Sequence, residues 1–507
     1  AHHYGAALPG GDAARAVETA RRAAERATTL LAHEEAARYY RLALQAIESG
    51  GAGAPAALRA SMHNALGEAL TMAGEYLQAR EAFERAAAQA RADGAADQLA
   101  RAALGFETAT WSPGLPGSDA ARLLREALDA QGGAGGTLKA QLLSSLARAL
   151  IFSGDDTQAV IVQAQALAMA RRSADPPTLI STLLATASVH WQPERRVERV
   201  RNFEEARALA ERSGDVQRAL EAEAWHLFEL MELGDMSAWR ARLEHYERGA
   251  AELRQPFLHY IAVTSRATHA LLEGRFAEAE TLIGQALQIG RRMPGLDAPG
   301  VYGMQMFALR SEQGGLRELA PLVRHFVRSM PGASTWRPGL ALIYAEIGAL
   351  DEARVEFEAL AADDFGAIGR DGLRAASLGY LAQVCAGLGD APRATLLYRL
   401  LLPYDGRNLL VGTTVGCFGA AASLLGLLAA TGRAWSDAER HYESAIEMNR
   451  RQHAEPALAH TRYRYALMRN ARAAPGDRSA AHALLEQAGA TAGRLGMRAL
   501  VERAGSA

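Results

Sequence analysis

The sequence predicts an all-α fold without a sheet: a superhelical solenoid of about twelve helix pairs with a period near 40 residues. Three observations predict it. The composition favours helices, glycines recur at a regular interval, and one pattern of small and aromatic residues repeats along the chain.

The composition is dominated by Ala, Leu, Arg and Glu, and only 6% of the residues are aromatic. These common residues are strong helix formers, and small alanine side chains let neighbouring helices approach closely. With 507 residues the chain exceeds the size at which one hydrophobic core keeps growing. A repeat array avoids that limit, because each unit packs only against its neighbours.

Glycines mark the repeat. The first six are spaced by 40, 40, 80, 40 and 40 residues, and the missing position falls on Glu194. Glycine adopts the left-handed conformation that ends a helix, so each unit should consist of a helix, a tight turn and a second helix. The nine positions are Gly74, Gly114, Gly154, Gly234, Gly274, Gly314, Gly348, Gly389 and Gly432.

The second helix of each unit carries Ala, an aromatic residue four positions later, and Ala or Leu three positions further. Offsets of four and seven share one helical face, so these side chains should form a buried stripe. The first helix contributes Leu and a small residue, as in Leu66-Gly67, twelve or thirteen positions before the Ala. This is the tetratricopeptide pattern with a longer period. Its aromatic positions, expected to be buried, include Phe83, Phe357, Tyr398 and Tyr442.

The pattern divides the chain into four parts. We expect an opening helix pair at 1–49, tetratricopeptide-like repeats at 50–180, divergent repeats at 181–335 and further tetratricopeptide-like repeats at 336–507. The divergent part and its end contain four of the six tryptophans, namely Trp191, Trp225, Trp239 and Trp336.

Charge and motifs argue against several classes of function. The chain has 55 basic and 57 acidic residues, so it shows no electrostatic footprint for nucleic acid. Its one lysine, Lys139, lacks the glycine spacing and hydroxyl of a phosphate-binding loop. The adjacent His2 and His3 are interpreted as a helix surface rather than as metal ligands. We therefore predict no enzyme activity and no cofactor.

Cysteine use and hydropathy indicate a cytoplasmic protein. Cys385 and Cys417 lie in apolar stretches expected to be helical and form no CxxC pair, which is typical of buried thiols. Charged residues interrupt every apolar run before about 18 residues, so no membrane span is predicted. The chain starts at Ala1 without Met, and we expect a fragment or a processed product.

Three stretches resemble one protein family. The opening, from His2-His3-Tyr4 to Val17 and then Ala32 to Tyr40, resembles the segment after the ATPase module of large bacterial STAND-type signalling ATPases. These include LuxR-type large ATP-binding regulators and ATPase-linked nucleotide cyclases. The stretch Leu401 to Asn408 is similar to that family, and the closing part, Gly432 to Tyr442 and Leu495 to Leu500, resembles the end of the same arm.

The resemblance implies a sensor arm. Such an arm binds a protein or small-molecule inducer and regulates an upstream ATPase domain of the same polypeptide and an output domain. The alternative is a free-standing tetratricopeptide scaffold that binds a peptide or helix on its concave face. An upstream Walker motif in the complete reading frame would distinguish the two.

Candidate ligand-binding residues fall in the divergent part, because local sequence rules tend to fail where function intrudes. Aromatic faces beside hydrogen-bonding groups suit a small polar ligand. The alternative is that the tryptophans only fill the core and the irregular repeats bend the solenoid. The candidates are Trp191, Trp225, His226, Tyr302, Gln305, Arg310, Glu312 and Trp336.

We expect the purified chain neither to bind nor to hydrolyse ATP, since its one lysine has no phosphate loop around it. Isothermal titration calorimetry measures this directly. Saturable binding of ATP would contradict the interpretation.

Overall fold

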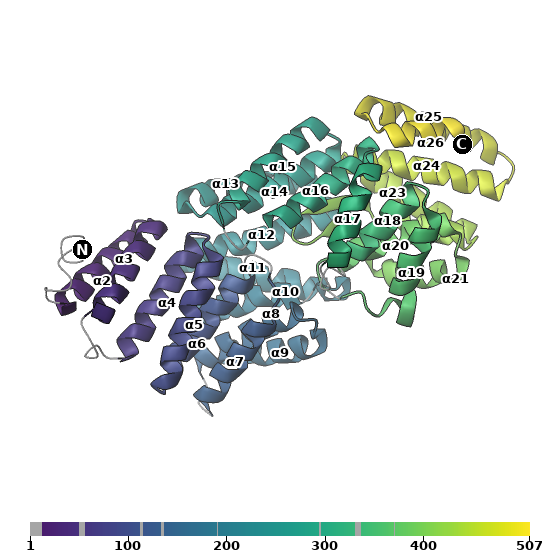
Figure 1. Ribbon diagram of the computed structural model, residues 1–507. Coiled ribbons are helices and arrows are strands. Elements are labelled where there is room, and N and C mark those ends of the chain that lie inside the picture. Colours follow the sequence, from purple (N-terminus) through teal and green to yellow (C-terminus); the bar gives the residue numbers. More distant parts are fainter. Residues whose placement is uncertain are drawn as a thin grey trace.

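The computed structural model describes residues 13–49, 56–111, 115–132, 136–189, 191–293, 296–329, 336–369 and 371–507. Within them, helices α2 to α25 form twelve consecutive pairs, and α26 packs on the last one. The pairs follow one another along a superhelix from the N-terminal to the C-terminal end (Figure 1). The predicted all-α solenoid of about twelve pairs is therefore confirmed for these residues.

The first helices of the pairs are α2 (Ala13–Thr29), α4 (Ala56–Met72), α6 (Ala96–Trp111), α8 (Thr137–Ile151), α10 (Pro176–Val189), α12 (Val216–Leu233), α14 (Pro256–Glu273), α16 (Ala298–Gln313), α18 (Arg337–Glu346), α20 (Arg374–Leu388), α22 (Ala422–Thr431) and α24 (Glu455–Arg472). The second helices are α3 (His33–Ser49), α5 (Tyr76–Ala92), α7 (Ser118–Gln131), α9 (Asp156–Ser173), α11 (Arg196–Ser213), α13 (Met236–Leu253), α15 (Phe276–Gly290), α17 (Leu316–Ser329), α19 (Leu350–Ala361), α21 (Ala391–Leu401), α23 (Trp435–Arg451) and α25 (Asp477–Leu495). The remaining elements are α26 (Arg498–Ser506) and the short 3₁₀ helices η1 (Pro193–Arg195), η3 (Ala362–Phe365) and η4 (Leu402–Tyr404).

The predicted glycines separate the two helices of a pair. Seven of them have positive φ: Gly74, Gly154, Gly234, Gly274, Gly314, Gly348 and Gly389. Gly432 is the exception, because its φ is −80° and the next residue, Arg433, takes the left-handed conformation at φ 60°. The missing position, Glu194, lies in η1, and Gly114 lies outside the described residues.

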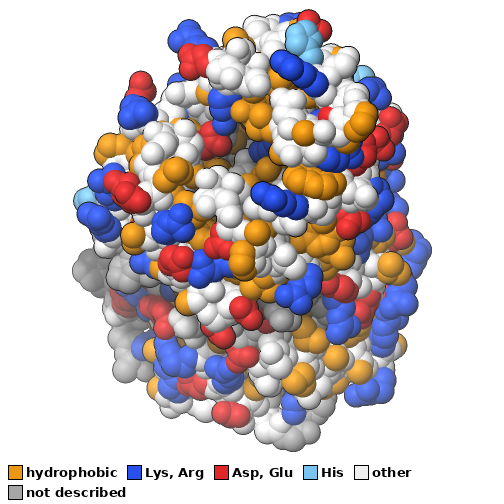
Figure 2. Space-filling model, turned by 90° about the vertical axis from the view of Figure 1, so that its right-hand side faces the viewer, with side chains coloured by type: hydrophobic (Ala, Val, Ile, Leu, Met, Phe, Trp, Pro, Cys, Tyr) orange, Lys and Arg blue, Asp and Glu red, His pale blue; other side chains and the backbone are white. Residues whose placement is uncertain are grey.

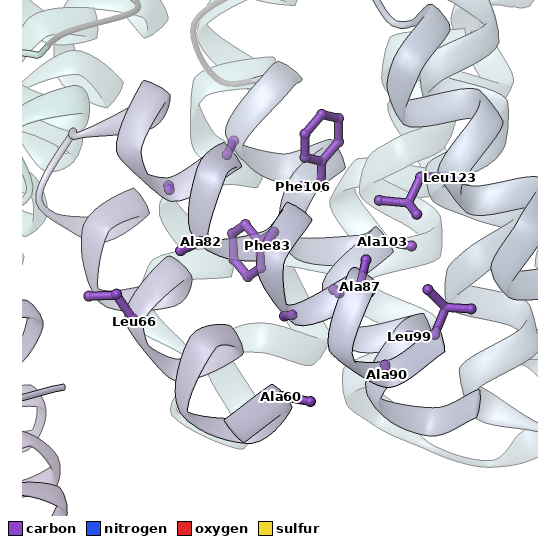
Figure 3. Close-up of a cluster of buried hydrophobic side chains, with 14 of the residues drawn as sticks. Ala60, Leu66, Ala82, Phe83, Ala87, Ala90, Leu99, Ala103, Phe106 and Leu123 are labelled. Atoms are coloured by element: carbon purple, nitrogen blue, oxygen red, sulfur yellow. The ribbon is translucent and has the colours of Figure 1, made fainter. Parts of the chain in front are cut away.

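The small residue of the first helix and the aromatic residue of the second helix interlock. Phe83 on α5 is 1% exposed and packs among helices α4, α5 and α6 (Figure 3). A Cβ atom added at Gly67 on α4 would lie 2.7 Å from its ring, and one added at Gly105 on α6 would lie 2.2 Å away. Glycine at these two sites therefore lets three helices share one ring.

The same interlock recurs where the aromatic residue follows the small one by sixteen positions. Phe357 and Tyr442 are fully buried as predicted. Tyr398 is only partly buried, which corrects the prediction, and its hydroxyl lies 2.8 Å from the Nε2 atom of His441. In the fourth pair the aromatic position holds Gln163, whose amide donates to the Thr182 carbonyl oxygen at 2.7 Å.

The expectation of a fold without a sheet is wrong in one place. Strands β1 (Asn408–Val411) and β2 (Gly416–Ala420) form an antiparallel hairpin between α21 and α22. Residues 411–416 combine glycines with Val and Thr, which disfavour a helix and suit an extended chain. Cys417 is accordingly on a strand and only partly buried, whereas Cys385 is buried in α20.

Successive turns of the superhelix touch each other. The second pair meets the seventh where the Gln255 amide nitrogen lies 3.7 Å from the Met72 sulfur and the rings of Tyr76 and Phe257 are 6.4 Å apart. The seventh pair in turn contacts the twelfth, through α14 and α24. One superhelical turn therefore takes about five pairs, and the turns are stacked rather than separated.

The outer surface is mixed in charge. Figure 2 shows basic and acidic side chains interspersed on one face of the molecule, with apolar side chains scattered between them. None of the described helices combines the length and apolarity that a membrane crossing requires.

We expect Gly105→Ala to lower the free energy of unfolding by about 1–3 kcal/mol, because its Cβ atom would overlap the Phe83 ring. Gly387→Ala in α20 is the matched control, since a Cβ atom there meets no atom within 4 Å. Removing that helical glycine should instead stabilise the chain by about 0.5–1 kcal/mol. Urea unfolding measures both, and equal effects would contradict the interlock.

Candidate functional site: a cavity inside the superhelix

The first helices enclose a cavity of about 900 Å³. Helices α4, α6, α8 and α10 line it from one superhelical turn, and α12, α14, α16, α18 and α20 line it further along the chain. The loop of the β-hairpin, Val411 to Val415, forms another part of the wall. This volume lies in the range of sites that hold small molecules or cofactors.

The hairpin loop is held between α14 and α16. The hydroxyl groups of Ser265 and Thr414 are 2.7 Å apart, and the Thr268 hydroxyl lies 2.8 Å from the Val415 carbonyl oxygen. The Gln305 amide nitrogen lies 3.1 Å from the same carbonyl. Three side chains of the seventh and eighth pairs therefore fix a loop that belongs to a later part of the chain.

A buried ionic cluster holds the base of the hairpin. Arg199 on α11 is fully buried and pairs with Glu229 and Glu232 of α12. Glu232 also lies 3.6 Å from Arg407, which precedes β1. Asn408, the first residue of β1, donates to the Met231 carbonyl oxygen at 2.7 Å. The end of α12 thus carries the hairpin.

This cluster explains one irregular repeat. Arg199 stands twelve positions after the buried Ala187 and four before Phe203, where the repeat normally has Ala. An arginine there is too long for the usual close helix contact and reaches two carboxylates instead. Burial raises the pKa of Glu232, and the positive charge of Arg199 opposes that shift.

Three of the predicted tryptophans meet at the cavity wall. Trp191, Trp225 and Trp336 all line it. The rings of Trp191 and Trp225 are 5.2 Å apart and form an edge contact. Trp191 also lies against Gly372, where a Cβ atom would come within 2.9 Å of the indole ring. The fourth tryptophan of this part of the chain, Trp239, is instead a fully buried core residue.

The other five predicted residues are not among those that line the cavity. Gln305 holds the hairpin loop, as described above. Tyr302 is partly buried and packs against the core around α14 and α15. Arg310 pairs with Glu280 at 2.7 Å, and Glu312 lies 2.9 Å from the Nε2 atom of His460 on α24.

His226 lies beside the cavity rather than in it. Its ring packs on Phe203, with 5.7 Å between the ring centroids, and its Nδ1 atom is buried without a hydrogen-bond partner among the described residues. Burial, together with the positive charges of Arg242 and Arg207, lowers the pKa of His226 to about 4. This histidine is therefore held in its neutral form.

The cavity has a polar region that the sequence interpretation missed. Arg148 on α8 binds Glu107 in a bidentate pair, with N–O distances of 2.7 and 2.6 Å, and its guanidinium lies 4.7 Å from the centre of the Trp111 ring. Arg218 pairs with Asp215 at 2.5 Å. Glu221 lines the cavity between these two pairs.

A signal for this region was present in the sequence. Gln217, Glu221 and Trp225 follow one another at spacings of four on α12, so polar and aromatic groups share one helical face. Arg148 and Trp111 come from the regular repeats, where nothing distinguishes them from other helix-surface residues. Only the winding of the superhelix brings them to the same cavity.

Metal or catalytic clusters do not define this site. Among the described residues, no group of three or more His, Cys, Asp and Glu side chains is arranged to hold a metal ion. His2 and His3 lie outside the described residues.

The depressed pKa of His226 predicts a pH effect. Its folded-state value of about 4 is below the ordinary 6.5, so as pH falls through this window the unfolded state takes up the proton first and stability is lost. We expect His226→Phe to lose less stability than the parent chain between about pH 7 and about pH 5, measured by urea unfolding. The exposed His482 provides the control substitution, His482→Phe, which should keep the parent's pH dependence.

Comparison with known proteins finds no matching family model and no matching curated protein. Three solved structures are similar in fold class. The Cut9–Hcn1 hetero-tetramer of the APC/C gives 13% identity over 95% of this chain and 96% of that chain, with a TM-score of 0.34. Naa15/Naa10 bound to HypK-THB gives 11% over 97% and 94%, with a TM-score of 0.21. A circular tandem repeat protein with novel repeat topology gives 14% over 96% and 90%, with a TM-score of 0.14.

Proposed function

We propose that this chain is the ligand-sensing arm of a larger signalling protein and that it binds a small molecule inside its superhelix. The cavity of about 900 Å³ carries this proposal. Its wall is mainly apolar and aromatic, and polar groups occupy a few positions, which is the usual composition of a small-molecule site.

A small molecule fits this cavity better than a peptide or helix does. The first helices form the concave face of a tetratricopeptide array, and here that face is turned inward as the cavity wall. The stacked turns and the hairpin loop restrict it to a bounded volume. The alternative of a free-standing scaffold with a long peptide groove is therefore less well supported.

The cavity wall also suggests how a signal could be passed on. It combines α4 to α10 with α12 to α20 and the hairpin loop, so one ligand contacts segments far apart along the chain. A ligand can shift a conformational equilibrium only if it binds one arrangement better than another. Contacts across several repeats supply such a difference. In a STAND-type protein, which the sequence resembles, the responding module is an upstream ATPase.

We expect substitutions that fill the cavity to weaken binding of an apolar probe. Nile red, which fluoresces in apolar surroundings, should bind the purified chain in a saturable way. Ala224→Trp on α12 and Met304→Trp on α16 project a larger side chain from the wall, and each should weaken binding by about tenfold. Fluorescence titration gives the dissociation constants.

Ala483→Trp is the matched control, because Ala483 is an exposed helical residue on α25. It should bind Nile red as the parent chain does. Circular dichroism verifies that all three variants remain folded. Equal affinity in the parent and in both cavity variants would place the binding site elsewhere. A Walker motif upstream in the complete reading frame would support the attachment to an ATPase.

A further inference from the structure

We propose that the cavity selects apolar molecules that carry an amine, and that the ammonium group of the ligand pairs with the carboxylate of Glu221. This inference rests on the proposed function, since it assumes that the cavity binds a ligand. It adds the chemical class of that ligand and the residue that recognises it.

Glu221 is the cavity carboxylate that lacks a direct partner. It lies on α12 and lines the wall, yet no hydrogen bond or ion pair within 4.0 Å joins its side chain to another described residue. The neighbouring charges are already matched, because Arg148 binds Glu107 and Arg218 binds Asp215. Two arginines against three carboxylates leave a net charge of −1, and that charge belongs to Glu221.

Aromatic groups around Glu221 suit a cation. Trp225 lies one helical turn beyond it on the same face, and Trp191 packs edge-on against that indole. Cations are attracted to the faces of aromatic rings, most strongly to tryptophan. Tyr246 also lines the cavity, is fully buried, and has a hydroxyl without a hydrogen-bond partner among the described residues. That hydroxyl can accept a hydrogen bond from an ammonium group.

Burial makes Glu221 sensitive to its occupant. Removal from water raises the pKa of its carboxyl, and the charges of Arg148 and Arg218 only partly oppose that shift. An isolated carboxylate is costly in such surroundings, whereas one paired with an ammonium is not. An amine ligand therefore supplies the missing counter-charge.

An acidic ligand fits this region less well. Arg148 and Arg218 are the basic side chains beside Glu221, but the guanidinium of Arg148 is already engaged by both oxygens of Glu107. Arg218 is bound by Asp215 and by the Ser181 hydroxyl. A carboxylate ligand would displace one of these acids or approach Glu221 itself, and both arrangements bring like charges together.

The test uses three probes with one ring system and different polar groups: 1-naphthylmethylamine, 1-naphthylmethanol and 1-naphthoic acid. Calorimetric titration near pH 7 should show that the parent chain binds the amine at least about tenfold more tightly than the alcohol, and the acid most weakly. Glu221→Gln keeps the shape of the side chain but removes its charge. It should lower the affinity for the amine to that for the alcohol, while the alcohol changes by less than about twofold.

Two further variants make the test decisive. Glu221→Leu should lose the preference for the amine as Glu221→Gln does, which keeps the test valid if one of them folds poorly. Glu447→Gln removes a carboxylate that is 70% exposed on α23 and should keep the preference. Equal binding of amine and alcohol to the parent chain, or a preference that survives in both Glu221 variants, would overturn the inference. If Nile red still binds in that case, the cavity remains the ligand site; if neither Nile red nor any naphthyl probe binds, the proposed function itself fails.

Discussion

The contact between successive superhelical turns is the constraint on which the cavity depends. A tetratricopeptide-like array can wind openly, and its concave face is then a groove. Here the second helix pair reaches the seventh through Met72, Tyr76, Gln255 and Phe257, and the seventh reaches the twelfth. Because each pair packs mainly against its neighbours, these long-range contacts add little to local folding. They decide instead that the inward faces of the first helices enclose a bounded volume.

The irregular repeats serve this closure. In a regular pair, a small residue on the first helix accepts an aromatic ring from the second, as Gly67 accepts Phe83. At the Ala position of α11 the chain has Arg199, which forms a buried cluster with Glu229 and Glu232. A buried cluster of this kind is weak evidence for stability. Its structural consequence is specific: it places the end of α12, and with it the hairpin that forms one wall of the cavity.

The cavity therefore combines two kinds of residue. Trp191, Trp225 and Glu221 come from the divergent repeats and carry the aromatic and acidic groups. Arg148 comes from a regular repeat, and the hairpin loop from a segment far along the chain. A ligand that touches all of them connects the two ends of the array. This arrangement suits a sensor, because binding can be coupled to the way in which the superhelical turns pack.

The sequence by itself determined the repeat architecture. Periodic glycines and the small-aromatic pattern are local signals, so they predicted twelve helix pairs, most of the turns and the burial of Phe83, Phe357 and Tyr442. It also predicted the part of the chain from which the tryptophans of the cavity come. The strands, the cavity and its polar region were decided by tertiary structure. Glu221 and Arg148 are 73 residues apart in the numbering, and the hairpin loop is nearly 200 further on. No local pattern encodes their meeting, because it follows from the small rotation between pairs accumulated over a superhelical turn.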